Sequence, residues 1–345
     1  MFLEIKNRLE SELKTYTRTI NNTYSLNKLS PLLFNKIKEF ISRDGKRVRP
    51  ILFCIGYLGF AKKEIKGLYR SALSLELLHD FMLIHDDIID KSDTRRGKPS
   101  MHSLFNEYLK KKKVKFSGED LSIIVGDVIY AMALDSFLAV EEKYKRKELA
   151  LKKLISAALF TGSGEFIELL LGTKPIGKTT KNDIYKIYDY KTANYTFASP
   201  LTMGSILAGA KTNQTERLFS YGMLLGRAFQ VRDDIIGIFG EEKDIGKSNL
   251  SDIKEAKRTL LVWYAFNHAI KKDRSIIKQI MQGESSNKTE LFKMRNIIVE
   301  SGALAYAENQ IRYLFSKARI QLRGLKMNAR YKQALDNFSQ KILKT

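Results

Sequence analysis

The tetrapeptide Asp-Asp-Ile-Ile occurs twice in this chain, at 86–89 and 233–236, each time inside an otherwise apolar stretch with helical spacing. On a helix, residues three and four apart share a face, so Asp86 and Asp87 project beside Asp90. Carboxylates crowded on a buried helix face repel one another, and their desolvation adds to the cost. Mg²⁺ removes both penalties because it combines a few carboxylates with phosphate oxygens. Two such helices facing each other predict a site for several Mg²⁺ ions around one polyphosphate.

The rest of the chain is also patterned as helices. Apolar residues recur at helical spacing through most of the 345 residues, for example at Leu68, Ala72 and Leu75, and alternating strand patterns are hard to find. Only five prolines occur, and none follows Pro200. The pattern predicts an all-α fold. Because no Pro/Gly/Ser-rich linker divides the chain, we expect one domain over residues 1–345.

The cysteine content and the apolar runs bear on the compartment. Cys54 is the only cysteine and lies in the apolar run 51–55, which predicts a buried structural thiol and excludes an intramolecular disulfide. The first residues lack the basic start and apolar stretch of a signal peptide. No run approaches the roughly 18 apolar residues of a membrane-spanning helix. These features predict a cytoplasmic protein.

The formal net charge of +22 raises the question of a nucleic-acid partner. The lysines are spread along the chain, the basic runs lack interleaved aromatic residues, and no helix-turn-helix, RRM or zinc pattern occurs. We therefore predict no nucleic-acid partner. A basic surface also suits anionic small substrates and anionic lipid headgroups.

A basic segment at 45–50 is the first candidate for anion binding. It contains Lys46, Arg47 and Arg49, bounded by a glycine and a proline, where a turn between two helices is expected. Lys and Arg side chains on such a turn converge readily on a phosphate. A short basic turn is also compatible with a solvated surface.

Two further basic features accompany the first acidic motif. His79 lies seven residues before Asp86, on the same helix face, where it is either a core histidine or part of the site. Arg95 and Arg96 follow the motif in a loop that ends with glycine and proline. They either neutralise the carboxylates by ion pairing or, if Mg²⁺ does so, take phosphate oxygens bidentately.

With these motifs the chain resembles the trans-isoprenyl diphosphate synthases, or polyprenyl synthetases, from about Lys28 to the end. Each piece is weak alone, whereas their order and spacing together are specific. The pieces are Gly45–Pro50, Glu76–His79, Asp86–Asp90, Arg95–Pro99, Gly126-Asp127, Gly164-Glu165, Lys191–Ala193, Phe229–Asp234, Gly246-Lys247, Asp252, Lys257–Thr259 and Ser301–Ala303.

The resemblance implies a single-domain helical bundle around a central substrate cavity and a homodimer. It implies an Mg²⁺-dependent prenyltransferase that condenses isopentenyl diphosphate with an allylic diphosphate to a short-chain all-trans product. A geranylgeranyl product is favoured, with a farnesyl or longer product left open. A class I terpene cyclase shares the fold but lacks the isopentenyl diphosphate site. A non-catalytic subunit of a heteromeric synthase commonly loses the acidic motifs.

The resemblance also assigns roles residue by residue. The residues implied to bind isopentenyl diphosphate are Lys46, Arg49, His79 and Arg96. Those implied to bind Mg²⁺ are Asp86, Asp87, Asp90, Asp233 and Asp234. Those implied to contact the allylic diphosphate or line its site are Arg95, Lys191, Gln230, Lys247 and Lys257, with Thr192 near the reacting carbons. The implied catalytic set joins Lys191, Thr192 and Gln230 to the five aspartates.

The chain departs from the family pattern at two positions. Gly237 stands where many relatives have a third aspartate, which predicts activity with altered metal binding, and a glycine there also allows close helix packing. Glu168 stands where the family often has glutamine, which adds a charge near the substrate site.

Product length is expected to depend on the residues one turn before the first motif. Helix geometry nominates Met82, one turn before Asp86 on its face. The family resemblance nominates Phe81, five residues before the first aspartate, and a bulky aromatic there resembles geranylgeranyl diphosphate synthases. Both positions are also compatible with ordinary core residues.

A lysine-rich segment at Lys110–Lys115 lies in a stretch between His102 and Gly126 that is longer than in typical relatives. The simpler interpretation is a solvated loop. The alternative is contact with a membrane surface, because long prenyl products partition into lipid.

Overall fold

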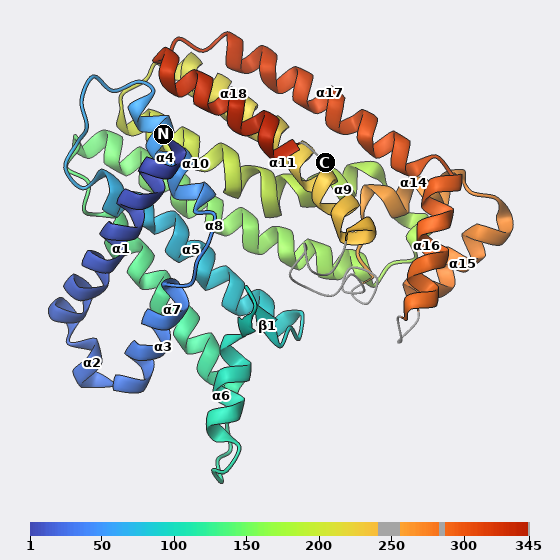
Figure 1. Ribbon diagram of the computed structural model, residues 1–345, viewed down its shortest axis with the longest axis horizontal. Helices are drawn as coiled ribbons and strands as arrows, with labels where there is room; N and C mark the ends of the chain where they lie inside the picture. Colours follow the sequence, from blue (N-terminus) through green and yellow to red (C-terminus); the bar gives the residue numbers. More distant parts are fainter. Residues whose placement is uncertain (241–255, 283–286, 344–345) are drawn as a thin grey trace. The chain divides into compact units, whose positions relative to one another are not determined.

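The computed structural model describes residues 1–240, 256–282 and 287–343, and these are almost entirely helical (Figure 1). The only strands among the described residues are β1 (Thr94–Arg95) and β2 (Lys98–Pro99), a two-residue antiparallel pair. The predicted all-α fold is confirmed. Contacts divide the chain into unit 1 (Met1–Leu151 and Met203–Gly209) and unit 2 (Lys152–Thr202 and Ala210–Thr345). The single domain and its central cavity stay predictions.

Unit 1 is built around one long helix that carries the first acidic motif. Its helices are α1 (Phe2–Tyr24), α2 (Leu26–Leu29), α3 (Pro31–Ile41), α4 (Val48–Leu58), α5 (Leu68–Ile89), α6 (Met101–Leu109) and α7 (Gly118–Phe137). The start of α8 (Tyr144–Gly172) and the end of α10 (Ser199–Leu207) complete it.

Helix α5 is buried on several sides, which explains why its sequence is apolar all round before the acidic motif. It packs on α7, α4 and α1. At Gly126 of α7, a β-carbon would lie 2.4 Å from Nε2 of His85. From α1, the Tyr16 hydroxyl donates to the carbonyl of Met132 at 2.7 Å. Cys54 of α4 is buried, and desolvation raises the pKa of its thiol, which confirms the predicted structural role.

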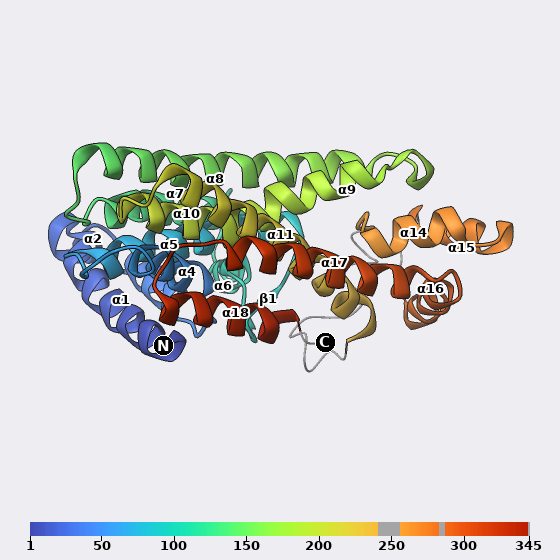
Figure 2. The same cartoon turned by 90° about the horizontal axis from the view of Figure 1, so that it is seen from above.

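Unit 2 contains the second acidic motif. After the remainder of α8 and α10, its described elements are η1 (Ile176–Lys178), α9 (Lys181–Ile187), η2 (Tyr188–Ala198), α11 (Thr212–Phe239), α14 (Leu260–His268), α15 (Lys271–Gln282), α16 (Lys288–Glu300), α17 (Ala303–Arg323) and α18 (Ala329–Leu343). Helix α11 packs against η2, α17 and α18. Figure 2 shows α17 and α18 running antiparallel, and Arg319 pairs with Asp336 between them at 3.1 Å.

Helices α11 and η2 approach each other closely because two glycines lie at the contact. A β-carbon at Gly222 would lie 2.5 Å from Cα of Ala198, and one at Gly226 would lie 2.4 Å from Cα of Ala193. Both distances are shorter than real contacts allow. The two glycines are four residues apart, so they lie on one face of α11. That face continues to Gln230 and to the second acidic motif.

Helix α8 corrects one expectation from the sequence. Among the described helices it alone is long and apolar enough to cross a membrane by length and composition, with a mean hydropathy of 1.5 over its best 18 residues. We missed it because Glu165, Glu168 and small residues interrupt the apolar run. One such helix is weak evidence for a membrane span. The two glutamates bind a lysine of η2, so part of this helix packs on its own chain.

Candidate diphosphate and metal sites

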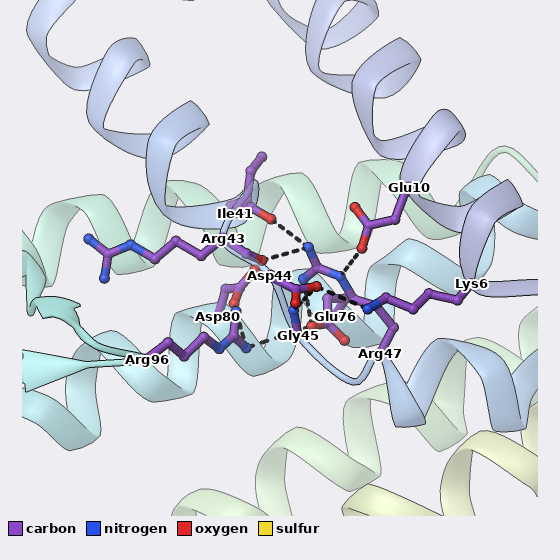
Figure 3. A network of polar contacts seen from close by, with 10 residues as sticks. All are labelled: Lys6, Glu10, Ile41, Arg43, Asp44, Gly45, Arg47, Glu76, Asp80 and Arg96. Carbon is purple, nitrogen blue, oxygen red and sulfur yellow. Dashed lines mark hydrogen bonds and ion pairs between the residues drawn. The ribbon is translucent and has the colours of Figure 1, made fainter. Parts of the chain in front are cut away.

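The basic turn before α4 contains one arginine with a structural role, Arg47, and two candidate diphosphate ligands, Lys46 and Arg49. Arg47, the N-cap residue of α4, has a left-handed φ of 49° and is buried. Its guanidinium donates to the carboxylates of Glu10 and Glu76, each at 2.8 Å. It also donates to the carbonyls of Ile41 and Arg43 (Figure 3). Arg47 therefore ties α1, α3 and α5 to the turn.

The residues on either side of Arg47 are in different surroundings. Lys46 is exposed and Arg49 is half-buried. The opposite burial of Lys46 and Arg47 follows from the turn, because Arg47 points inward at its left-handed position. The structure thus places the two residues that the resemblance implies as isopentenyl diphosphate ligands on a backbone that Arg47 holds in place.

A second basic segment reaches the same turn from the β-hairpin. Arg96 has a left-handed φ of 55° and is followed by Gly97 at φ 70°, which turns the chain sharply between β1 and β2. Its guanidinium lies against Gly45, where a β-carbon would be 3.5 Å from Cζ. It forms ion pairs with Asp80 at 3.6 Å and Glu76 at 3.8 Å. Two basic segments about fifty residues apart in sequence therefore meet at one place.

His79 lies on α5 among these cations and is neutral at ordinary pH. Desolvation, followed by the charges of Arg49 and Arg96, lowers the pKa of its imidazole well below the usual value. A neutral imidazole offers one N–H donor to an anion. The structure brings all four implied isopentenyl diphosphate ligands, Lys46, Arg49, His79 and Arg96, into unit 1.

The first acidic motif forms the C-terminal end of α5, with Asp90 as the C-cap. Asp87 is fully buried, whereas Asp86 and Asp90 are half-buried. Arg95 donates to Asp87 through Nε at 2.7 Å and also through Nη2. Desolvation raises the pKa of Asp87, and the Arg95 guanidinium opposes that rise. In this structure Arg95 therefore forms an ion pair with the motif.

The chemistry of this motif fits Mg²⁺. Its donors are hard carboxylate oxygens, and Oδ2 of Asp87 is buried without a hydrogen-bond partner. Within the described residues, no three His, Cys, Asp or Glu side chains converge as a complete metal site. Mg²⁺ is usually held by one or two carboxylates together with waters and substrate phosphates. The side chains present therefore suit a metal that arrives with a diphosphate.

The two candidate chain-length residues have different neighbours. Met82 is buried, and Phe81 is half-buried. The Phe81 ring lies 4.6 Å from the His85 ring and 5.2 Å from the Tyr130 ring of α7, measured between centroids. Phe81 is therefore supported by a second aromatic residue from another helix.

The second acidic motif in unit 2 is part of a hydrogen-bond chain. Thr192 donates to Oε1 of Gln230 at 2.6 Å, and Nε2 of Gln230 donates to Asp234 at 3.0 Å. The Tyr188 hydroxyl also donates to Asp234 and accepts from the backbone N–H of Leu260 at 2.9 Å. Asp234 is buried, whereas Asp233 is exposed. Three implied site residues, Thr192, Gln230 and Asp234, thus contact one another in sequence order.

The backbone explains this convergence. Gly222, Gly226, Gln230 and Asp234 are four residues apart along α11, so the face that packs closely on η2 also carries the polar side chains. The segment η2 is a wide π-helix, a form that is frequent at functional sites. We missed Tyr188 in the sequence. Its position one turn before Thr192 on the same helix was the available signal.

Lys191 is held between two acidic side chains of α8. Its Nζ lies 2.5 Å from Glu165 and 2.6 Å from Glu168. The helices approach at Gly164, where a β-carbon would lie 2.9 Å from Cβ of Tyr190. Glu168, which stands where the family often has glutamine, therefore contacts Lys191. A glutamine at position 168 would offer Lys191 an uncharged acceptor instead.

The remaining implied ligands lie in or near the segment before α14. Lys247, like Gly246 and Asp252, lies outside the described residues. Lys257 is half-buried in unit 2. Its neighbour Arg258 donates to the carbonyls of Gly172 and Lys174 at 3.1 and 3.0 Å. Arg258 therefore secures the segment that carries Lys257. Gly237 is buried in α11, consistent with close packing there.

The chain is similar in sequence to a known family and to several known proteins. The polyprenyl synthetase family model matches residues 30–298. A geranylfarnesyl diphosphate synthase of Aeropyrum pernix is 32% identical over 286 residues, which cover 81% of this chain and 84% of that protein. A geranylgeranyl diphosphate synthase of Saccharolobus solfataricus is 29% identical over 311 residues, covering 89% and 85%.

Solved structures show the same fold. The structure of geranylgeranyl pyrophosphate synthase from Corynebacterium glutamicum, complexed with isoprenyl diphosphate and magnesium, matches with a TM-score of 0.90 over 99% of this chain and 98% of that one. The two sequences are 23% identical, so this likeness concerns the fold. The family match covers most of the chain and includes both acidic motifs. The chain belongs to the polyprenyl synthetase family.

Proposed function

We propose that this protein is a prenyltransferase that condenses isopentenyl diphosphate with an allylic diphosphate, giving a short-chain all-trans prenyl diphosphate. The observation that carries the proposal is the meeting of two basic segments, 45–50 and 95–96, beside the helix of the first acidic motif. One helix thus serves an anion site and a metal site together. Several relatives are named geranylgeranyl diphosphate synthases, which supports that product.

The aspartates of the two motifs are proposed as the Mg²⁺ ligands: Asp86, Asp87 and Asp90 in unit 1, and Asp233 and Asp234 in unit 2. When bound, Mg²⁺ supplies charge stabilisation for a departing diphosphate. Arg95, Lys191, Lys247 and Lys257 are proposed to contact the allylic diphosphate, and Gln230 and Tyr188 to orient Asp234.

The reaction itself needs no protein nucleophile. The allylic C–O bond breaks and pyrophosphate leaves with the electron pair. The double bond of isopentenyl diphosphate attacks the allylic carbon, and the proton lost from the adduct goes to the departing pyrophosphate. In this proposal Lys46, Arg49, His79 and Arg96 hold the attacking substrate, and Thr192 lies near the reacting carbons. Fixed positive charges act where negative charge develops on the leaving group.

The test is incubation of the purified protein with Mg²⁺, isopentenyl diphosphate and each allylic starter in turn, followed by dephosphorylation and sizing of the products. A prenyl alcohol longer than the starter supports the proposal. A cyclic hydrocarbon released without isopentenyl diphosphate favours a terpene cyclase. Folded protein that is inactive until a second subunit is added favours a non-catalytic subunit.

Phe81 is proposed as the residue that limits product length, supported by Tyr130. Phe81→Ala removes the ring and opens space below the first motif, so we expect a product at least one isoprene unit longer than that of the wild type. The measurement is reversed-phase sizing of the dephosphorylated products. Met82→Ala is the comparison at the other candidate position. An unchanged product length in Phe81→Ala removes Phe81 from this role.

Glu168 is proposed to weaken the hold of Lys191 on the allylic diphosphate. Glu168→Gln keeps a hydrogen-bond acceptor for Lys191 but removes one of the two negative charges beside it. We expect KM for the allylic diphosphate to fall several-fold, about 1 kcal/mol of binding, with KM for isopentenyl diphosphate unchanged. Steady-state kinetics with each substrate varied in turn measures both. A rise in KM for the allylic diphosphate contradicts the assignment.

We also propose that the protein is a homodimer and cytoplasmic. The support for the dimer is an exposed apolar face on α8, where Ile155, Leu159 and Phe166 are 45%, 61% and 64% exposed. Residues 155, 159 and 166 lie at four- and seven-residue spacing, which places them on one face. A second copy of the chain covers such a face in water. Light scattering on the eluting protein measures the mass, and a monomer mass contradicts the dimer.

Contact of the Lys110–Lys115 loop with an anionic membrane is a further proposal. Residues 110–116 are all exposed, and Val114 and Phe116 stand among the lysines. The loop is the tip of the α6–α7 hairpin in unit 1 (Figure 1). Flotation with vesicles of neutral lipid, or with added anionic lipid, tests it. Replacing Lys111, Lys112, Lys113 and Lys115 by Ser abolishes binding, whereas replacing Lys271, Lys272, Lys288 and Lys293 leaves it unchanged; equal effects indicate attraction by net charge alone.

A further inference from the structure

Two acidic residues, Glu76 and Asp80, lie one turn apart on the buried face of α5, and they differ in their hydrogen-bond partners. Glu76 is 3% exposed and accepts from Arg47 at 2.8 Å. Asp80 is 0% exposed, and neither of its carboxylate oxygens has a hydrogen-bond partner. A buried ionised carboxylate without hydrogen bonds is costly. Asp80 therefore depends on nearby charge.

The nearest cation to Asp80 is the Arg96 guanidinium. Nη2 of Arg96 lies 3.6 Å from Oδ1 of Asp80 and 3.8 Å from Oε1 of Glu76. Both distances are too long for hydrogen bonds, so the attraction is between charges. Nη1 of Arg96 is buried without a hydrogen-bond partner. Arg96 is thus placed by two carboxylates and retains donors that neither carboxylate uses.

The charged groups that act most strongly on Asp80 come from three places. Glu76 lies on α5 itself, Arg47 and Arg49 belong to the basic turn, and Arg96 belongs to the hairpin. Desolvation and Glu76 raise the pKa of Asp80 well above its usual value, and the three arginines oppose this rise. Glu76 has a hydrogen bond from Arg47, whereas Asp80 has no hydrogen-bond partner. The charge of Asp80 therefore depends on Arg96, the cation with which it forms an ion pair.

A diphosphate at Arg96 changes this balance. In a buried site of low effective dielectric, a new anion on the far side of the guanidinium repels an ionised Asp80 strongly. The same anion takes up the positive charge that kept Asp80 ionised. Protonation of Asp80 removes the repulsion and leaves Arg96 in place between the acid and the ligand.

We propose that Asp80 is a positioning residue for Arg96 whose proton is linked to substrate binding: above the pH at which it ionises in the empty site, Asp80 takes up one proton when isopentenyl diphosphate binds. This inference rests on the proposed function, because that function makes Arg96 a diphosphate ligand. In the empty site Asp80 is the counter-ion of Arg96, and the diphosphate of the bound substrate replaces it in that role.

The linkage between proton uptake and binding determines the direction in which the Kd for isopentenyl diphosphate changes with pH. Above the pH at which Asp80 ionises, each pH unit raises the Kd for isopentenyl diphosphate by up to tenfold, because binding consumes a proton. Asp80→Asn replaces the carboxyl by a neutral group of the same shape. This variant binds isopentenyl diphosphate more tightly than the wild type at alkaline pH. The ratio of wild-type to variant Kd grows with pH, and the titration of the substrate itself cancels in that ratio.

Isothermal calorimetry tests the inference directly. Isopentenyl diphosphate is titrated into the full-length protein without Mg²⁺ or an allylic diphosphate, at several pH values and in buffers of different ionisation enthalpy. The wild type takes up close to one proton more than Asp80→Asn in the pH range where the two Kd values diverge. Binding of a phosphate group to cations by itself releases protons, which is the opposite sign.

Controls separate this role from a purely structural one. His79→Gln weakens the binding of isopentenyl diphosphate, but at saturating ligand it retains the proton uptake per molecule bound, which excludes His79 as the acceptor. In the activity assay, Asp80→Asn leaves KM for the allylic diphosphate unchanged, whereas a general disturbance of the fold alters it. Asp80→Thr serves as a second neutral variant if Asp80→Asn does not fold.

The outcomes distinguish failure of the role given to Asp80 from failure of the proposed function. Tight binding of isopentenyl diphosphate with equal proton uptake in the wild type and both Asp80 variants overturns the role of Asp80 alone. Failure of the wild type to bind isopentenyl diphosphate overturns the proposed function and this inference with it. Loss of uptake in the variants, with uptake retained in His79→Gln, establishes Asp80 as the linked group.

Discussion

Asp86→Asn lowers kcat by about 10³-fold, the largest effect on activity that we expect from a single substitution in the first motif. Asp86 is half-buried at the end of α5, next to the buried Asp87 that Arg95 already neutralises. An amide has the same shape but is a poor Mg²⁺ ligand. Losing this proposed metal ligand weakens the electrostatic stabilisation of the departing diphosphate, an effect of about 4 kcal/mol in comparable sites.

The measurement is kcat with saturating substrates and Mg²⁺, together with calorimetric binding of the allylic diphosphate with and without Mg²⁺. The wild type binds it more tightly with Mg²⁺, and Asp86→Asn loses that gain. Asp93→Asn makes the same charge change at an exposed residue after the motif and retains full activity. Equal losses in both variants indicate that the local charge, and not metal binding, is the cause.

Arg47→Ala destabilises the fold by about 3–5 kcal/mol, because it leaves the buried Glu76 carboxylate without its hydrogen-bonded partner. The substitution also removes the donors to two backbone carbonyls and to Glu10. Urea unfolding followed by circular dichroism measures the loss as a lower midpoint. Because Arg47 and Glu76 lie beside Asp80 and Arg96, we expect the Arg47→Ala variant to lose isopentenyl diphosphate binding as well.

Lys46→Ala is the matched control for this prediction. Lys46 is the neighbouring cation but is exposed, so its removal changes the free energy of unfolding by no more than about 0.5 kcal/mol. It raises KM for isopentenyl diphosphate about tenfold, as expected for one hydrogen bond to a charged group. The two variants thus distinguish a residue that stabilises the fold, Arg47, from a residue that binds substrate, Lys46, in the same turn. A stability loss in Lys46→Ala similar to that of Arg47→Ala contradicts the division.

Much of the fold could be predicted because helical periodicity is a local property. The spacing of apolar residues around Leu68 to Leu78 identified α5, and the absence of alternating patterns excluded a large sheet. The two acidic motifs were recognisable for the same reason, since residues three and four apart on a helix share a face whatever the tertiary structure. The buried Cys54 followed from its apolar surroundings.

Partners from distant segments could not be predicted. Lys46 and Arg47 are adjacent in sequence, yet only Arg47 reaches Glu10 and Glu76, 37 and 29 residues away. Tyr188 reaches Asp234 across 46 residues, through a contact between two helices that the sequence does not pair.

The sequence by itself determined the all-α class, the two acidic motifs and the set of basic residues near them. Only the tertiary structure decided that Arg47 supports the fold, that Arg95 donates to Asp87, and that Asp80 faces Arg96 without a hydrogen bond. The physical reason is that periodicity assigns a residue to a helix face, whereas the charge and burial of its side chain depend on which distant groups are packed against that face.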